Sequence, residues 1–600
     1  MNVKMNLEMS KEISKPEQLI TEHIDIWTSS ILAKSTSGRG SSKKYELYGV
    51  TKLRELILEL AVRGKLVPQD ENDEPASVLL EKTAVEKAKL EEDGTIKKPK
   101  SVHKITNEEK PFNLPTGWKW ARLSDISHYQ VGKTPSTKNP SYWTESDKGI
   151  PWVSISDLNH FGTVKSTSKK ITPLASESIF KAEPVRAGTI LMSFKLTLGK
   201  ISILEEDAYH NEAIISLYPF SGIFKEYLFT TLPKRALSGN SKQAIMGNTL
   251  NSKSLSLLLI PIPPLAEQKR IVAKVDELMM LCDQLEQQTE DSIDAHATLV
   301  EVLLAMLTDS VDADELAQNW SRISEHFDSL FTTKQSIEAL KQAVLQLAVM
   351  GKLVQQDPND EPASVLLEKI AKEKEQLVKE GDIKKTKPLP ELTDDEKPFE
   401  SPTGWEFYRL GNLIKKLGSG STPRGGQNAY VSEGIPFLRS QNVWNEGLNN
   451  DDIAYITSET HQRMSNTVVY PGDILLNITG ASLGRSIVFP DTYLEANVSQ
   501  HVTIIRLIDH SMTPFIYLCI RSPLLQKIVW ERQVGMAIEG LSKKVLELFE
   551  IPIPPLSEQQ RIVAKVEELM AICDQLKERL KQSQETQVQL TDALIDRALG

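Results

Sequence analysis

The sequence is poor in the residues that build disulfide frameworks and metal sites. It has 3 cysteines and 10 histidines among 600 residues. Three cysteines cannot staple a small secreted scaffold, and the histidines show no metal-ligand spacing with one another or with cysteine. Cys282 and Cys573 occupy the same position of a repeated segment, so we expect small buried core residues in a reducing compartment. We therefore predict no metal site.

Long apolar runs are also missing. The most apolar stretch, residues 255–265, contains three prolines and is too short to span a bilayer. The first twenty residues carry six charged side chains, so we expect no secretory signal there. With 40% hydrophobic and 25% charged residues, the composition is that of an ordinary globular protein. We expect a cytoplasmic protein with no membrane insertion.

Catalytic signatures are the third absence. Gly132-Lys133-Thr134 resembles the end of a phosphate-binding loop, but Ser127 stands where that loop needs glycine. Residues 139–142 (Asn-Pro-Ser-Tyr) lack the second proline of the motif with which amino-methyltransferases hold a flipped adenine. No glycine-rich loop for S-adenosylmethionine accompanies them, and residues 490–497 fall short of a nuclease triad. We predict that the chain catalyses nothing by itself.

What the sequence does contain is one unit that occurs twice. Elements within residues 60–118 return within residues 347–405, shifted by 287. Residues 260–285 return as 551–576, shifted by 291, with 21 of 26 positions identical. The segments between them diverge. A period this long indicates domain-sized copies, and constant ends around unlike middles predict two related but different targets.

The charge is unevenly distributed along the chain. The net charge is −11, but residues 115–264 hold 17 Lys and Arg against 11 Asp and Glu, a local +6. Residues 402–555 hold 13 against 14, a local −1. Phosphate contact needs local cations and not a basic total. The first variable segment therefore fits a nucleic-acid surface, and the second gives little electrostatic support.

Apolar periodicity predicts the helices of the repeated parts. Residues 53–61 have apolar side chains at i, i+3, i+4, i+7 and i+8, which predicts an amphipathic helix that ends at Gly64. A matching helix near residues 340–349 ends at Gly351. Charged helical stretches are expected at residues 82–92 and 369–380. Residues 35–44 are expected to be a flexible polar linker.

The variable segments read as mixed α/β domains. Each contains short apolar, β-type runs separated by Gly, Pro, Asn and Ser. The expected strands are residues 150–155, 189–194, 213–217, 435–438, 473–478 and 502–507.

Beyond the proline cluster each copy becomes a helix of about 40 residues, roughly 60 Å long. Its apolar residues follow two seven-residue registers, as a coiled-coil seam requires, with polar breaks at Ser292 and Ser583. The first register continues to Leu299, Met306 and Leu590. The main expected seam residues are Ile271, Val275, Leu278, Leu285, Ile562, Val566, Leu569 and Leu576. Alternatively, each stripe packs only onto its own globular domain.

The repeated motifs resemble the specificity subunit of type I restriction–modification enzymes. They are LAVxGKLV, EPASVLLEK, PTGW, the glycine–threonine–proline turn that opens each variable segment, and IPIPPLxEQxRIVAKVxEL, and they cover the chain from about residue 50 onward. The resemblance implies an α+β fold with two mixed α/β target-recognition domains. These are joined by two long helical segments that pair as an antiparallel coiled coil, with an internal pseudo-two-fold repeat. The expected segments are 1–50 (N-terminal segment and linker), 51–114 (helical repeat), 115–264 (first recognition domain), 265–401 (central helical spacer), 402–555 (second recognition domain) and 556–600 (distal helix).

The resemblance also implies a function and partners. Each recognition domain would read one half of an asymmetric bipartite site on double-stranded DNA, and the spacer would set the gap. Two modification (methyltransferase) subunits and two restriction (motor-nuclease) subunits would carry the chemistry. S-adenosylmethionine, ATP and Mg²⁺ would then bind the partners and not this chain. A self-contained DNA methyltransferase or nuclease, and a coiled-coil adaptor that binds only proteins, are the alternative interpretations.

Candidate DNA contacts are chosen by residue type and position. Arg suits guanine, Gln and Asn suit adenine, and Lys or a backbone amide suits phosphate. In the first variable segment the candidates are Lys133, Thr134, Ser154, Ser156, Asn159, Lys195 and Lys200. In the second they are Ser421, Thr422, Arg424, Arg439, Ser440, Gln441, Asn442, Asn477, Thr479 and Arg485. Trp118 and Trp405 lie in repeated sequence, so we expect them to anchor each domain to the frame.

Overall fold

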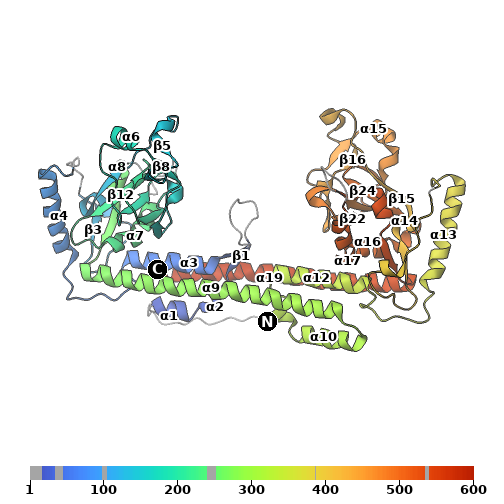
Figure 1. Cartoon of the computed structure of the whole chain (residues 1–600). Coiled ribbons are helices and arrows are strands. Elements are labelled where there is room, and N and C mark those ends of the chain that lie inside the picture. Colours follow the sequence, from blue (N-terminus) through green and yellow to red (C-terminus); the bar gives the residue numbers. More distant parts are fainter. Residues whose placement is uncertain are drawn as a thin grey trace. The chain divides into compact units, whose positions relative to one another are not determined.

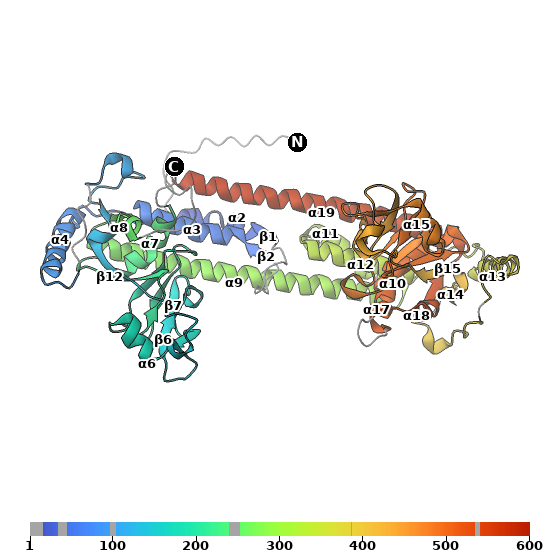
Figure 2. The same cartoon turned by 90° about the horizontal axis from the view of Figure 1, so that it is seen from above.

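The computed structural model describes residues 16–33, 45–96, 104–238, 252–385, 387–533 and 540–599. The chain forms two compact units (Figures 1 and 2). Unit 1 comprises Met1–Asp291 together with Ser583–Gly600, and unit 2 comprises Ser292–Gln582. Each unit contains a mixed α/β domain beside helices of the repeated sequence. The predicted linker at residues 35–44 lies outside the described residues.

The domain of unit 1 has two sheets that share one apolar core. Buried side chains from both sheets, among them Val153, Leu191 and Ile214, form this core. One sheet has the order β4 (Ser127–Val131), β12 (Ile214–Pro219), β9 (Ile190–Ser193), β10 (Ile201–Leu204) and β7 (Gly162–Val164). The other has the order β11 (Tyr209–His210), β6 (Ile150–Val153), β8 (Lys169–Ile171) and β5 (Trp143–Thr144).

The domain of unit 2 repeats the central strands of this plan, but its first sheet has four strands in place of five and the outer strand of its second sheet lies on the other edge. One sheet has the order β15 (Ile414–Ser419), β24 (Val502–Leu507), β21 (Ile474–Asn477) and β22 (Ser486–Val488). The other has the order β19 (Ala454–Ile456), β16 (Ile435–Leu438), β23 (Ala496–Val498) and β20 (Val468–Val469). All six strands expected from the sequence are confirmed, with ends that differ by one or two residues at most.

A two-stranded antiparallel ribbon joins the first and last strands of each domain. In unit 1, β3 (Lys119–Arg122) pairs with β13 (Leu259–Ile262), and in unit 2, β14 (Glu406–Arg409) pairs with β25 (Glu550–Ile553). The proline-rich segment was expected only to mark a boundary, yet part of it forms a buried strand. Proline is tolerated there because a two-stranded ribbon leaves one side of each strand unpaired.

The short frame helices follow the predicted periodicity. Helix α3 (Tyr48–Arg63) ends at Gly64, which has a φ of 68°, and α12 (Lys334–Val349) is followed by Gly351 at 72°. The charged helices begin earlier than predicted, because α4 spans Ala76–Glu92 and α13 spans Ala363–Glu380. Each therefore includes most of the repeated EPASVLLEK segment, and the proline before its first residue occupies the N-cap.

Each short frame helix contacts two long helices, α9 (Leu265–Asp309) and α19 (Leu556–Leu599). In unit 1, Arg54 of α3 pairs with Asp283 of α9 at 2.6 Å, and Tyr48 donates to Asp592 of α19 at 2.8 Å. In unit 2, Lys341 of α12 pairs with Asp574 of α19 at 2.6 Å.

Two equivalent lysines bond to carbonyls at the ends of the long helices. The ammonium of Lys65 donates to the carbonyl of Leu599 at 2.9 Å, and that of Lys352 donates to the carbonyls of Thr308 and Ser310. A cation at a helix C-terminus satisfies orphan carbonyls and complements the helix dipole. The lysine of the GKLV segment in each copy therefore caps the C-terminus of the long helix that begins in the other copy.

The buried stripe of each long helix departs from the predicted heptad. Most expected seam residues are buried or half-buried, but Leu299, Met306 and Leu590 are 50%, 41% and 43% exposed. Val300 and Leu307 are buried instead. From Ile271 to Leu307 is 36 residues, ten turns at 3.6 residues per turn, whereas a strict heptad repeat reaches position 306. The inward face therefore follows a straight helix.

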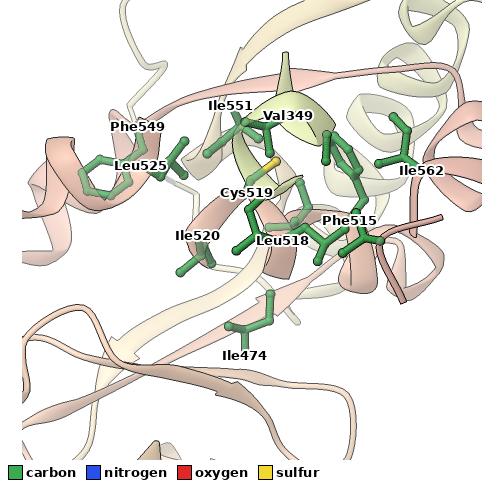
Figure 3. Packing of buried hydrophobic residues seen from close by; sticks show 14 of the residues in the cluster. Val349, Ile474, Phe515, Leu518, Cys519, Ile520, Leu525, Phe549, Ile551 and Ile562 are labelled. Atoms are coloured by element: carbon green, nitrogen blue, oxygen red, sulfur yellow. The ribbon is translucent and has the colours of Figure 1, made fainter. Parts of the chain in front are cut away.

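The first half of α19 packs into the core of its own unit. Ile562, Val566 and Cys573 belong to one buried cluster with residues of α12 and of α16 (Thr513–Arg521). Figure 3 shows Ile562 and Val349 in this cluster beside residues of α16, among them Phe515. Cys282 and Cys573 are both buried, as predicted. In the described part of the chain, no helix has the length and apolar character of a membrane span.

Candidate nucleic-acid interface

A glycine turn begins the polar edge of each domain. A Cβ on Gly132 would come within 2.0 Å of the carbonyl oxygen of His210, and one on Gly420 within 1.8 Å of that of Val498. The amide of Lys133 donates to His210 at 2.9 Å, and that of Ser421 donates to Val498 at 3.1 Å. These amides are used inside the domain, so they do not serve phosphate as the sequence had led us to expect.

The side chains of the turn have defined partners. The Lys133 ammonium donates to the carbonyl of Ile179 at 2.8 Å, although the residue itself is exposed. The hydroxyl of Thr134 donates to the carboxylate of Glu212, and that of Thr422 donates to the side-chain carbonyl of Gln500. The three candidates of the second turn, Ser421, Thr422 and Arg424, are exposed.

In the first domain, the predicted serines form a short turn at the end of β6. The Ser154 hydroxyl donates to Asp157 at 2.7 Å and lies 2.7 Å from that of Ser156. Burial acts to raise the pKa of Asp157, but hydrogen bonds from Ser154 and Ser168 outweigh it and lower the pKa. Asn159 is exposed beyond this turn.

The hairpin between β9 and β10 lies against this turn. Lys200 donates to the carbonyl of Ile155 at 3.2 Å, while the Lys195 ammonium lies 5.1 Å from the ring centre of Phe194. The serine turn and Lys200, predicted separately, are therefore brought together.

In the second domain, the side chains of the predicted Arg–Ser–Gln–Asn cluster at residues 439–442 do not form one exposed surface. Asn442 is buried, and it accepts the amide of Arg439 at 2.9 Å while donating to two carbonyls. Arg439 pairs with Asp452 at 3.0 Å, and the exposed Gln441 donates to the same carboxylate. Asn442 supports the loop, and Ser440 is half-buried. Gln441 is the member of this cluster that solvent reaches most freely.

The hairpin between β21 and β22 lies beside this loop. Asn477 is fully buried and donates to the carbonyl of Ser440 at 2.8 Å. The Arg485 guanidinium lies 3.7 Å from the ring centre of Trp444, which is 38% exposed. Thr479 shares a hydrogen bond of 2.7 Å with His501. Sequence reasoning missed Trp444, His501, Gln500 and Glu212, since only the folded chain brings them to the predicted turns and loops.

Two identical anchors join each domain to its long helix. Trp118 donates to Glu267 at 2.9 Å, and Trp405 donates to Glu558 at 3.0 Å, with all four side chains buried. The anchoring role predicted for the tryptophans is thus confirmed. Burial raises the pKa of Glu267 to about 7, against the opposing hydrogen bond from Trp118. Burial likewise raises the pKa of Glu558.

Among the residues that the structure describes, no group of three or more His, Cys, Asp or Glu side chains is placed to bind a metal ion. The two domains therefore share one scaffold, and each carries a different set of polar side chains at the equivalent edge. Such an arrangement is typical of a protein that reads two different targets with one architecture.

A family model described as "Type I restriction modification DNA specificity domain" matches the chain twice, at residues 115–295 and 402–585. The chain therefore belongs to the type I restriction–modification DNA specificity family.

Curated relatives agree along the whole length. The chain is 41% identical over 613 residues to the EcoAI specificity subunit of a type I restriction enzyme from Escherichia coli, covering 97% of this chain and 100% of the relative. It is 40% identical to the EcoEI specificity subunit from the same species, with the same coverage. Among solved structures, a chain described under "complex assembly and conformational transition of the type I R-M system" is 20% identical, with a TM-score of 0.44 over 82% of this chain and 99% of that chain. The predicted resemblance to a specificity subunit is confirmed, and the alternative interpretations find no support.

Proposed function

We propose that this chain is the DNA-reading subunit of a type I restriction–modification complex, and that each domain reads one half of an asymmetric bipartite site. The observation that carries this proposal is that the two domains place different polar side chains on equivalent turns and hairpins. Gly132 and Gly420 lie in equivalent turns, and β9 and β21 are followed by equivalent hairpins. At matching positions of these hairpins stand Lys200 and Arg485, whose carbonyls accept the amides of Ser193 and Asn477.

The equivalent positions differ in the chemistry that base edges recognise. Lys133 in the first domain and Ser421 in the second occupy equivalent positions of the glycine turn. Ser154 and Arg439 likewise occupy equivalent positions after β6 and β16. Arginine favours guanine, amides favour adenine, and serine accepts either. Two halves with unlike sequences follow from these differences. The net charge of +6 on the first domain and −1 on the second also implies that phosphate attraction comes chiefly through the first domain and through partner subunits.

The two long helices are proposed to form the spacer as an antiparallel helical pair, which gives the chain its pseudo-two-fold repeat. In support, α9 begins in unit 1 and ends in unit 2, whereas α19 begins in unit 2 and ends in unit 1. A helix of 45 residues is roughly 65 Å long, about twice the ~34 Å of one turn of B-DNA. A rigid pair of this length would hold the gap between half-sites constant.

The repeated frame is proposed to dock two modification subunits at equivalent surfaces, with two restriction subunits beyond them. The near-identity of residues 260–285 and 551–576 supports two equal docking sites. S-adenosylmethionine, ATP and Mg²⁺ would then be bound by these partners, which perform methyl transfer, translocation and cleavage. The complex would act in the cytoplasm on the cell's own DNA.

The test is single-molecule sequencing of a host genome that carries this chain with its modification subunit, read for methylated adenines. We expect one bipartite motif with two unlike halves and a fixed gap. Exchanging residues 116–259 for those of a relative should change only one half. The proposal fails if an assembled complex produces no new methylated motif.

A further inference from the structure

Glu212 and Gln500 occupy one and the same position in the two domains. Glu212 follows β11 and Gln500 follows β23, and each lies 78 residues after the threonine that hydrogen-bonds to it. Thr134 and Thr422 are themselves separated by 288 residues, as are Glu212 and Gln500. The equivalence therefore extends into the part of the chain where the two copies no longer resemble each other in sequence.

The backbone around this position is tightly constrained in both domains. Next to each threonine turn, a glycine packs against the strand that precedes the Glu or Gln, with no room for a Cβ. The amides of Gly132 and Gly420 donate to the carbonyls of Ile214 and Val502, two residues beyond Glu212 and Gln500. Pro135 and Pro423 are buried behind the turn. A constrained backbone thus presents Glu212 in one domain and Gln500 in the other, both exposed.

The threonine hydrogen bond does not explain why this side chain is charged in one domain and neutral in the other, although the Gln500 amide nitrogen also lies 3.4 Å from the His501 ring nitrogen, where the first domain has Ala213. Its structural task is to accept the threonine hydroxyl, and a carboxylate oxygen or an amide oxygen does this equally well. Within the described ranges, Glu212 forms no ion pair, and Lys133 beside it donates to carbonyls instead. The second carboxylate oxygen of Glu212 is left for another donor.

We propose that Glu212 and Gln500 are specificity-determining residues, each reading a base edge of its own half-site. This inference rests on the proposed function. The Glu212 carboxylate accepts from an exocyclic amine, the N4 of cytosine or the N6 of adenine. Thr422 and His501 each engage one side of the Gln500 amide, and its second lone pair and second N–H remain as the acceptor and donor that adenine's N6 and N7 require. An exposed carboxylate beside a polyanion is repelled unless such an amine faces it, so Glu212 also rejects bases that present only acceptors.

The experiment compares three variants of the full chain, each assembled with the modification subunit. Glu212→Gln and Gln500→Glu exchange the two side chains while keeping the threonine hydrogen bond. Glu205→Gln is the matched control, because Glu205 is another exposed carboxylate of the first domain that accepts a threonine hydroxyl, from Thr163. The measurement is the methylated motif over a whole genome, with binding to an unrelated duplex as a second readout.

We expect Glu212→Gln to lower methylation of the native motif by roughly 5- to 150-fold and to relax one position of one half, the range that corresponds to one base contact. That half should be the one that changes when residues 116–259 are exchanged. Gln500→Glu should alter one position of the other half. Binding to the unrelated duplex should not fall for Glu212→Gln, since a negative charge has been removed.

Three results overturn the inference. The first is an unchanged motif in both exchanged variants. The second is a change in both halves from one substitution. The third is an equal effect of Glu205→Gln, which would mark a general loss of folding. If one exchanged variant does not assemble, the other decides. Absence of any bipartite motif from the wild-type complex refutes the proposed function itself, and is distinguishable because it precedes any substitution.

Discussion

The buried carboxylate Glu267 predicts a specific pH dependence of stability. Its side chain is 1% exposed, accepts one hydrogen bond from Trp118, and has a second oxygen with no partner in the described structure. Burial raises its pKa from 4.5 to about 7 in the folded protein. The folded state therefore holds a proton between these two values that the unfolded chain has already released. Stability contributed by this group is present below pH 4.5 and is lost as the pH rises towards 7.

The magnitude follows from the width of that window. A shift of one pKa unit corresponds to about 1.4 kcal/mol, so the full loss is about 3 kcal/mol, of which roughly 2–3 kcal/mol falls between pH 5 and pH 8. Glu267→Gln keeps an acceptor for Trp118 but cannot ionise. Its free energy of unfolding relative to wild type should therefore rise by about 2–3 kcal/mol on going from pH 5 to pH 8. Comparing the two pH values cancels the cost of placing a buried amide there.

The assay is urea unfolding of the full chain at both pH values, followed by Trp fluorescence. For the first unfolding transition, the free energy of unfolding of the variant minus that of wild type should be more positive at pH 8 than at pH 5. Glu558→Gln is the matched variant in unit 2, where burial also raises the pKa, and it should behave in the same direction. If the free energy of unfolding of the variant differs from that of wild type by the same amount at both pH values, then ionisation of the buried carboxylate does not destabilise the fold, and the reasoning is refuted.

Two further predictions test the helix register and the glycine turn. Leu307→Ala should lower the free energy of unfolding in urea by about 2–5 kcal/mol, because Leu307 is buried. Leu299→Ala should change it by no more than about 0.5 kcal/mol, because Leu299 is half exposed. A larger effect at Leu299 than at Leu307 would instead support the strict heptad register. Gly420→Ala should cost more than about 2 kcal/mol and abolish reading of one half-site by methylome sequencing, because the new methyl group meets a backbone carbonyl. Gly418→Ala is its control, since nothing lies within 4 Å of its Cβ position, and equal effects of the two would contradict the argument.

Much of the fold could be read from local pattern. Helix α3 and its glycine terminator follow from side-chain period and from the left-handed conformation that Gly64 adopts. The β-type runs follow from apolar composition between turn residues. The heptad error at Leu299 arose because a 3.5-residue and a 3.6-residue repeat differ by only one position after ten turns, and packing against α12 and its own unit decides between them.

The candidate site was harder to predict than the fold. Gln441 and Asn442 are adjacent amides of the same chemical type, yet one is exposed and the other supports a loop through Asn449 and Asp452. Residue type alone cannot separate these roles. Glu212 carries no signal in the sequence, because its threonine partner lies 78 residues away and only the pairing of strands brings the two together.

By itself the sequence determined that this chain is two copies of one scaffold around two unlike segments, since identity at a constant shift needs no structure to be seen. The helices, the turns and the family resemblance could also be read from the order of residues along the chain. Tertiary structure alone decided which polar side chains reach solvent, which are used up inside the domain, and which distant residues meet at one edge. The reason is physical: hydrogen bonds and burial depend on neighbours in space, and those neighbours are chosen by strand pairing and helix packing.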